Sequence, residues 1–144
     1  MRMLIAYLSY SGNTEEIAEL ITVACRQEGI VVDMYEIGFG SMPDIAAYDV
    51  ICLGTFTWDY GATPEEVKDF VAEVGYKPER VAIFGSGDTQ FGGEDMFCAA
   101  VEKLVRFYHS PWAGLKIEQS PRGQQEQLVH EWIEGVLHDV AVIA

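Results

Sequence analysis

The sequence predicts a doubly wound α/β fold, in which helices cover both faces of a parallel sheet. Short apolar runs recur along the chain, and most of them are continuous, which is typical of strands that are buried on both sides. Segments with apolar residues at helical spacing separate these runs. Because strands and helices alternate, right-handed crossovers and a parallel sheet are expected.

Five apolar runs are predicted strands: Met3–Leu8, Ile30–Met34, Val50–Leu53, Val81–Phe84 and a weaker Leu115–Ile117. Four further segments carry apolar residues three or four positions apart and are predicted helices. Their apolar positions are Ile17, Leu20, Ile21 and Ala24; Val67, Phe70, Val71 and Val74; Phe97, Ala100, Val101, Leu104 and Val105; and Leu128, Trp132, Val136 and Leu137.

The ends of two helices carry recognisable signals. Thr63 is the expected cap of the second helix, with Pro64 in its first turn and Glu66 placed to bond back to the cap. Gly29 and Gly75 stand where the first and second helices should end.

Length and composition limit the class of protein. The chain has 144 residues, 49% of them hydrophobic, and is expected to form one domain, residues 1–144, with a true core. Its formal net charge of −14 disfavours nucleic acid and anionic membranes as partners. Cys25, Cys52 and Cys98 lack C-x-x-C spacing, and their apolar neighbours favour buried free thiols in a reducing compartment. The Met3–Leu8 run is too short for a signal peptide, so we expect a soluble, cytoplasmic protein.

Ligands of a doubly wound sheet bind beyond the carboxyl ends of the strands. The loop after the first strand is polar and consists of Ser9, Tyr10, Ser11, Gly12, Asn13 and Thr14. The start of a helix offers unpaired N–H groups, which suit a phosphate. The loop has no Lys or Arg, so it differs from a nucleoside triphosphate loop and fits a single terminal phosphate held by neutral dipoles. The alternative is an ordinary turn in which Asn13 or Thr14 caps the helix.

The loop after the third strand is rich in aromatic residues. It runs through Gly54, Thr55, Phe56, Thr57, Trp58, Asp59, Tyr60 and Gly61. Aromatic side chains in a loop are costly to expose unless they cover something flat, and Trp58 is the best candidate for stacking on a ring. The alternative is that these side chains fold back over the core.

The loop after the fourth strand, residues 85–93, contains four glycines that could expose backbone amides. Its candidate binding residues are Ser86, Gly87, Asp88 and the aromatic Phe91. Gln90 stands where a dinucleotide fingerprint needs glycine, so that fingerprint is absent. The alternative is a flexible loop without a ligand. Together, the three loops are expected to form one site, with an anion-binding loop at one end and stacking aromatic side chains at the other. Such a site fits a planar heteroaromatic phosphate ester.

These motifs resemble those of the short-chain bacterial flavodoxins, and the resemblance covers essentially the whole chain. The first loop is similar to the family's phosphate loop, with Ser9 and Ser11 at the hydroxyl positions. Thr-x-Thr-Trp-x-x-Gly at Thr55–Gly61 and Gly-x-Gly-Asp at Gly85–Asp88 are also similar. The resemblance implies a flavodoxin-like three-layer sandwich with five parallel strands in the order 2-1-3-4-5.

The resemblance also implies the function: a low-potential one-electron carrier that binds flavin mononucleotide (FMN) non-covalently and has no substrate turnover of its own. It would take electrons from a basic-surfaced flavoprotein reductase, pass them to redox enzymes and act as a monomer. By resemblance, the first loop would hold the phosphate, Trp58 and Phe91 would cover the two faces of the flavin, and amides near Asp88 and Cys98 would meet its pyrimidine edge.

Two residues depart from the family's pattern. Phe91 stands where the family usually has Tyr, in a loop lengthened by Gly92 and Gly93. Asp59 stands where many relatives have Gly, at a peptide that turns over on reduction of the flavin and favours positive φ. Replacing Asp59 with Gly is therefore expected to raise the potential of the first one-electron step.

Three other functions fit the sequence less well. An NAD(P)H-dependent FMN reductase needs a nicotinamide site, for which 144 residues leave little chain. A flavoprotein that activates ribonucleotide reductase generally lacks the aromatic pair, so Trp58 argues against it. A phosphate-regulated receiver needs Asp at the end of the third strand, where this chain has Leu53 and Gly54.

Overall fold

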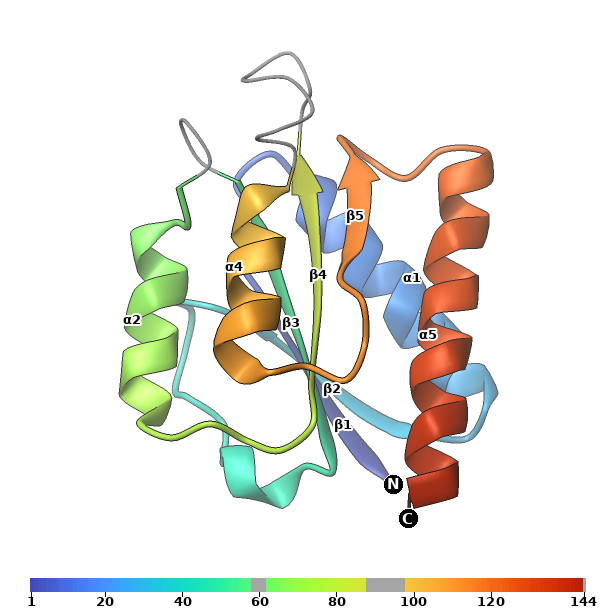
Figure 1. Ribbon diagram of the computed structural model, residues 1–144, viewed down its shortest axis with the longest axis horizontal. Helices are drawn as coiled ribbons and strands as arrows, with labels where there is room; N and C mark the ends of the chain where they lie inside the picture. Colours follow the sequence, from blue (N-terminus) through green and yellow to red (C-terminus); the bar gives the residue numbers. More distant parts are fainter. Residues whose placement is uncertain (58–61, 88–97, 144) are drawn as a thin grey trace.

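A parallel five-stranded sheet forms the centre of the computed structural model, which describes residues 1–57, 62–87 and 98–143 (Figure 1). Its strands are β1 (Arg2–Tyr7), β2 (Val31–Glu36), β3 (Val50–Phe56), β4 (Val81–Gly87) and β5 (Leu115–Glu118). All four pairings are parallel and the order is β2-β1-β3-β4-β5, so the predicted sheet is confirmed.

Helices cover the sheet on both faces (Figure 1). They are α1 (Asn13–Gln27), α2 (Glu65–Val74), α4 (Ala99–Tyr108) and α5 (Gln124–Ile143), and a short 3-10 helix, η1 (Ile45–Ala47), precedes β3. Helices α1 and α5 pack against one face of the sheet, and α2 and α4 pack against the other. The three-layer arrangement is therefore confirmed.

Side chains of β1 alternate between the two hydrophobic layers. Met3 and Ile5 belong to the layer under α1 and α5, while Leu4 and Ala6 belong to the layer under α2 and α4. All four are fully buried. A strand buried on both faces has no polar alternation, which is why the continuous apolar run was a reliable signal.

Strands β3 and β4 continue further than their apolar runs predict. The predicted loops begin at Gly54 and Gly85, but both glycines lie inside strands, next to side chains that leave no room for a Cβ. A Cβ on Gly54 would lie 2.3 Å from the ring of Phe84, and one on Gly85 would lie 2.5 Å from the Val101 side chain. These two glycines are required by packing, so interpreting Gly85 as a source of exposed amides was wrong.

The start of α2 also differs from the prediction. Pro64 occupies the N-cap position with extended backbone angles, and the helix begins at Glu65, so Thr63 is not the cap. The carbonyl of Pro64 accepts bonds from the N–H groups of Val67 and Lys68 at 3.1 and 3.2 Å. Proline disfavours helical geometry in the residue before it, which moves the helix start past Thr63. Gly75 ends α2 in a left-handed conformation, and Gly29 follows α1 in the same conformation, as predicted.

The three cysteines are buried and unpaired, as predicted. Within the parts of the chain that the structure describes, no helix combines the length and the apolar character that crossing a membrane requires.

Candidate functional site

The candidate site lies at the carboxyl edge of the sheet, where β1, β3 and β4 are adjacent strands and end side by side (Figure 1). In a doubly wound sheet this edge is the ligand-binding edge. The parallel topology therefore brings together residues 9–14, 55–57 and 86–87, which lie far apart in the sequence.

The first loop is closed by a contact within itself. The Gly12 N–H donates to the Ser9 hydroxyl at 3.1 Å. Gly12 occupies the N-cap position of α1 with φ of 93°, a left-handed conformation that glycine adopts without strain. A Cβ at this position would meet nothing within 4 Å, so the conformation, and not crowding, requires glycine here. The alternative that Asn13 or Thr14 caps the helix is wrong, because both residues lie inside α1.

Thr14 turns its hydroxyl toward the interior of the protein. Its Oγ1 lies 2.9 Å from Ser86 Oγ and 3.5 Å from the Thr55 carbonyl oxygen. Thr14 and Ser86 are 1% and 4% exposed. The three residues form a buried polar contact beneath the first loop, so Thr14 can present only its backbone N–H group to a ligand at the helix start.

Sequence reasoning missed the loop after β5, which packs against the first loop. Ser120 Oγ donates to Asn13 Oδ1 at 2.5 Å, and Arg122 Nη1 pairs with Glu16 Oε2 at 2.8 Å. The Gln119 N–H donates to the Gly87 carbonyl oxygen at 2.7 Å. The predicted topology could have indicated this loop, because a parallel β5 ends at the same edge of the sheet as β1.

The exposed tip of the first loop carries Tyr10 and Ser11. The Tyr10 ring lies 4.9 Å from the ring of Phe56, measured between centroids, at an interplanar angle of 49°. Phe56 is the last residue of β3 and packs partly buried against the core under α2 and α4, so its assignment to a loop was wrong. This ring contact ties the first loop to the end of β3.

Thr57 connects the end of β3 to the start of α4. Its Oγ1 accepts a bond from the Ala100 N–H at 3.2 Å and so caps the helix from a distant segment. Cys98 precedes α4 in a left-handed conformation, with φ of 52°. Burial raises the pKa of its thiol to about 12, and its Sγ lies 3.9 Å from the Gly85 carbonyl oxygen. Cys98 is therefore an unreactive, structural thiol.

The remaining candidate residues are Trp58, Asp59, Tyr60, Gly61, Asp88 and Phe91, and they lie outside the described residues. Their roles stay predictions.

Acidic groups surround the described part of the site. Glu15 and Glu16 lie in the first turn of α1, and Glu65 and Glu66 lie in the first turn of α2. Burial raises the pKa of Tyr7, at the end of β1, to about 12, and the charge of Glu15 adds to the shift. Arg122 offsets the charge of one of these acids through its ion pair with Glu16. The same hydrogen bond raises the pKa of the Arg122 guanidinium.

This geometry defines a class of protein: a doubly wound α/β protein in which a polar loop without Lys or Arg leads into the first helix at the carboxyl edge of the sheet. Among residues 1–57, 62–87 and 98–143, no cluster of three or more His, Cys, Asp or Glu side chains could hold a metal ion.

Comparison with known proteins defines the family. The profile of the flavodoxin family matches residues 5–132. The chain is 33% identical over 135 residues to probable flavodoxin 2 of Bacillus subtilis, covering 88% of this chain and 87% of that protein. Oxidised flavodoxin 2 from Bacillus cereus superposes with a TM-score of 0.83 at 33% identity, covering 96% of this chain and 99% of the other. The chain belongs to the flavodoxin family, whose members are flavoproteins that carry electrons.

A more distant structural neighbour is described with flavin mononucleotide bound. A mutant flavodoxin from Fusobacterium nucleatum bound to flavin mononucleotide superposes with a TM-score of 0.72 at 15% identity, covering 96% of each chain. At this identity the likeness concerns the fold.

Proposed function

We propose that this chain binds one FMN non-covalently and works as a low-potential one-electron carrier. The observation that supports this most is the first loop: left-handed Gly12 opens α1 at the carboxyl edge of the sheet, and Ser9 stabilises the turn. A helix N-terminus framed by hydroxyls is a site for a monophosphate. Bound FMN would supply the one-electron redox chemistry that the amino acids of this site lack.

The phosphate would be held by the backbone N–H groups at the start of α1 and by the side chains of Ser9, Ser11 and Asn13. These groups are neutral, so the phosphate would have no countercharge beside the acidic Glu15 and Glu16 and would depend on direct hydrogen bonds and on the helix N-terminus. Trp58 and Phe91 would cover the flavin ring and exclude water from it. Thr57 and Cys98 would act by fixing the start of α4, next to the ring.

Titration of the apoprotein with FMN and with riboflavin tests the assignment. Riboflavin has the same ring and lacks the phosphate, so it isolates the contribution of the first loop. We expect one equivalent of FMN to bind, with quenched fluorescence, and riboflavin to bind at least tenfold more weakly, which corresponds to about 1.4 kcal/mol. Equal affinity for the two compounds, or no binding of FMN, would contradict the proposal.

An electron carrier and a flavin reductase differ in whether NAD(P)H alone reduces the bound flavin. A carrier has no site for hydride transfer from a nicotinamide, so its flavin should be reduced only when a flavoprotein reductase is also present. Rapid bleaching of the FMN-loaded protein by NADPH or NADH alone would favour the alternative, a flavin reductase. Stopped-flow absorbance distinguishes the two outcomes.

We further propose that the electron donor has a basic surface. The net charge of −14, together with the acids at the starts of α1 and α2, would attract such a partner to the flavin edge. The expected observation is an association rate that falls steeply as ionic strength rises. A rate that does not respond to salt would contradict the proposal. A carrier that meets its partners in turn is also expected to be a cytoplasmic monomer.

A further inference from the structure

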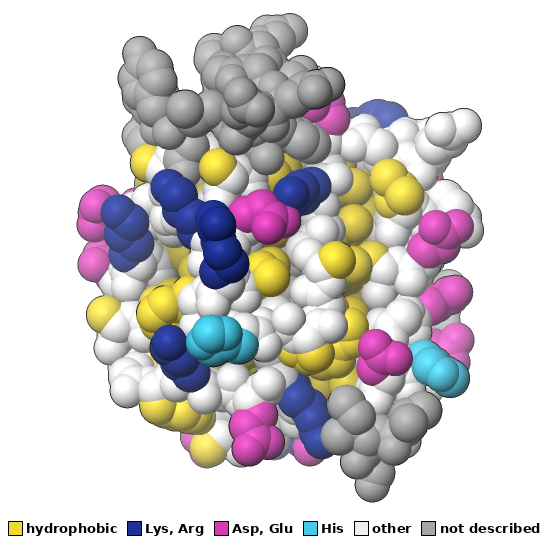
Figure 2. Space-filling model, viewed as in Figure 1, with side chains coloured by type: hydrophobic (Ala, Val, Ile, Leu, Met, Phe, Trp, Pro, Cys, Tyr) yellow, Lys and Arg dark blue, Asp and Glu magenta, His cyan; other side chains and the backbone are white. Residues whose placement is uncertain are grey.

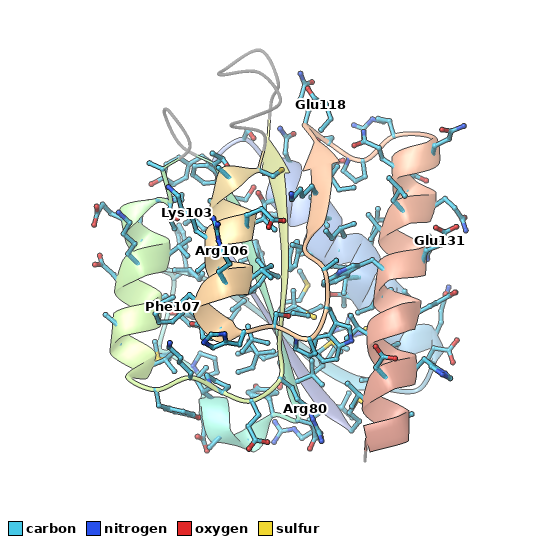
Figure 3. All side chains as sticks on the ribbon, viewed as in Figure 1. Arg80, Lys103, Arg106, Phe107, Glu118 and Glu131 are labelled. Carbon is cyan, nitrogen blue, oxygen red and sulfur yellow. The ribbon has the colours of Figure 1, made fainter. Side chains whose placement is uncertain are left out.

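A second surface feature lies away from the first loop, between the outer sides of α2 and α4. It is a groove of about 780 Å³, here called the α2–α4 groove. Val67 and Leu104 form its buried lining, and the aromatic side chains of Tyr76 and Phe107 are 52% and 42% exposed. Figure 3 shows Lys103 and Phe107 on α4, on the side nearer α2. Exposed aromatic residues beside an apolar groove are typical of a surface that binds another molecule.

The charge of this groove is opposite to that of the chain. Its described lining contains Lys68, Lys77 and Lys103 and no acidic residue, although the chain has 23 Asp and Glu against 9 Lys and Arg. Figure 2 shows Lys and Arg side chains gathered over α2 and α4. The acids Glu66, Asp69 and Glu73 of α2 are not among the lining residues. A basic, apolar groove on an acidic protein favours an acidic ligand by charge complementarity.

Two of the groove lysines already make weak contacts with neighbouring side chains. The Lys77 ammonium lies 4.2 Å from the centre of the Phe107 ring, so the two side chains form a cation–π contact within the groove. Lys68 lies 3.6 Å from Glu65 in an exposed pair, and such pairs contribute little energy, so a partner's carboxylate can compete for Lys68.

We propose that the α2–α4 groove docks an acidic amphipathic helix of a protein partner. Helix α2 has 10 residues and is therefore about 15 Å long, so a partner helix of three turns would lie along it. Apolar residues of that helix at positions i, i+3, i+4 and i+7 would contact Val71, Leu104 and Phe107, and flanking carboxylates would meet the lysines. This surface would let a partner bind without covering the first loop.

The probe is a fluorescein-labelled, helix-forming peptide of about 12 residues with leucines at i, i+3, i+4 and i+7 and glutamates elsewhere. A control peptide keeps the leucines and replaces each glutamate with lysine. We expect fluorescence anisotropy to show that the glutamate peptide binds at least tenfold more tightly. Amide NMR shifts should change in α2 and α4 and stay constant at residues 9–14.

Two matched double variants test the residues. The variant Lys68→Ala with Lys103→Ala removes two charges from the groove, and Arg2→Ala with Arg26→Ala removes two charges elsewhere. We expect the first to weaken binding of the glutamate peptide by about fivefold, from two exposed ion pairs, and the second to change it by less than about twofold. The variant Phe107→Ala should weaken the binding of both peptides.

Several outcomes would overturn the proposal: no binding of the glutamate peptide at millimolar concentration, equal binding of the two peptides, or an equal loss in the two double variants. Self-association that is lost in the groove variant, measured by sedimentation without peptide, would assign the groove to a second copy and also overturn it. FMN uptake by the groove variant should equal that of the parent, so this result does not depend on the proposed function.

Discussion

The hydroxyl oxygens of Thr14 and Ser86 lie 2.9 Å apart in the interior and join the first turn of α1 to the end of β4. Both side chains are almost fully buried, and this contact is the shorter of the two that the Thr14 hydroxyl makes, since the Thr55 carbonyl oxygen lies 3.5 Å away. The contact fixes the start of α1 relative to the sheet and so sets the position of the first loop, which carries the phosphate in the proposed function.

The two hydroxyls should contribute to stability as a coupled pair. Thr14→Val or Ser86→Ala leaves one buried hydroxyl short of a partner, and we expect each to lower the free energy of unfolding by about 1–2 kcal/mol. The double variant should lose less than the sum of the two. Urea unfolding measures all four proteins of this cycle. Strictly additive losses would show that the two hydroxyls do not interact.

Gly12 offers a test that separates strain from binding. Gly12→Ala should cost about 1 kcal/mol, because alanine must adopt a left-handed conformation. It should also lower FMN affinity at least tenfold and leave the weaker riboflavin affinity unchanged. Gly29→Ala is the matched control, since Gly29 has φ of 78° at the opposite end of α1 and equally open surroundings. If both variants bind FMN as the parent does, the first loop does not hold the phosphate.

Gly54 is required for a different reason, which is crowding. Gly54→Ala places a methyl group against the Phe84 ring, and we expect a loss of about 1–3 kcal/mol in unfolding free energy. Adding Phe84→Leu should recover part of this loss, because leucine leaves room where the ring was. Gly135→Ala, in the open surroundings of α5, should instead stabilise the protein by about 0.5–1 kcal/mol. A Gly54→Ala protein as stable as the parent would show that the Phe84 ring does not crowd position 54.

The buried cysteines predict lower stability in alkali. Burial raises the pKa of Cys25 to about 11 and that of Cys98 to about 12, and it raises the pKa of Cys52 as well. The unfolded chain loses its thiol protons from about pH 9 upward, while the folded chain keeps them. Stability is therefore complete below about pH 9 and falls as the pH rises toward the folded values, by about 1 kcal/mol per thiol between pH 9 and 10.

Urea unfolding at pH 7, 9 and 10 measures this slope. Cys25→Ala, which removes one of the thiols, should lose less stability than the parent between pH 9 and 10. Parallel pH profiles for the two proteins would show that the Cys25 thiol does not contribute.

The elements of the fold could be predicted because their signals are local. The run Met3–Leu8 identifies a doubly buried strand from its own composition, and Gly75 ends α2 through its own backbone freedom. Errors arose where a neighbour distant in the sequence decided the outcome. Gly54 and Gly85 were assigned to loops because a glycine required by the Phe84 ring or the Val101 side chain has the same local signal as a glycine in a turn.

The candidate site divides in the same way. Its first loop was identified from its hydroxyls and glycine alone. The inward orientation of the Thr14 hydroxyl could not be predicted, because its partner Ser86 lies 72 residues away along the chain. The contact of Ser120 with Asn13 could not be predicted either, because these residues are 107 positions apart. The α2–α4 groove was missed for the same reason, because its lysines come from α2, from the segment after it and from α4, which become neighbours only in the folded protein.

The apolar runs and turn signals along the chain were thus sufficient to predict the doubly wound sheet, because periodicity and turn chemistry act between near neighbours. The loop motifs, through their resemblance to those of flavodoxins, indicated the family and the edge of the sheet at which the candidate site lies. Only the tertiary structure decided which hydroxyls are buried, which glycines are required by packing and where the basic groove lies. Those properties depend on distances between segments, which exist only after the chain has packed.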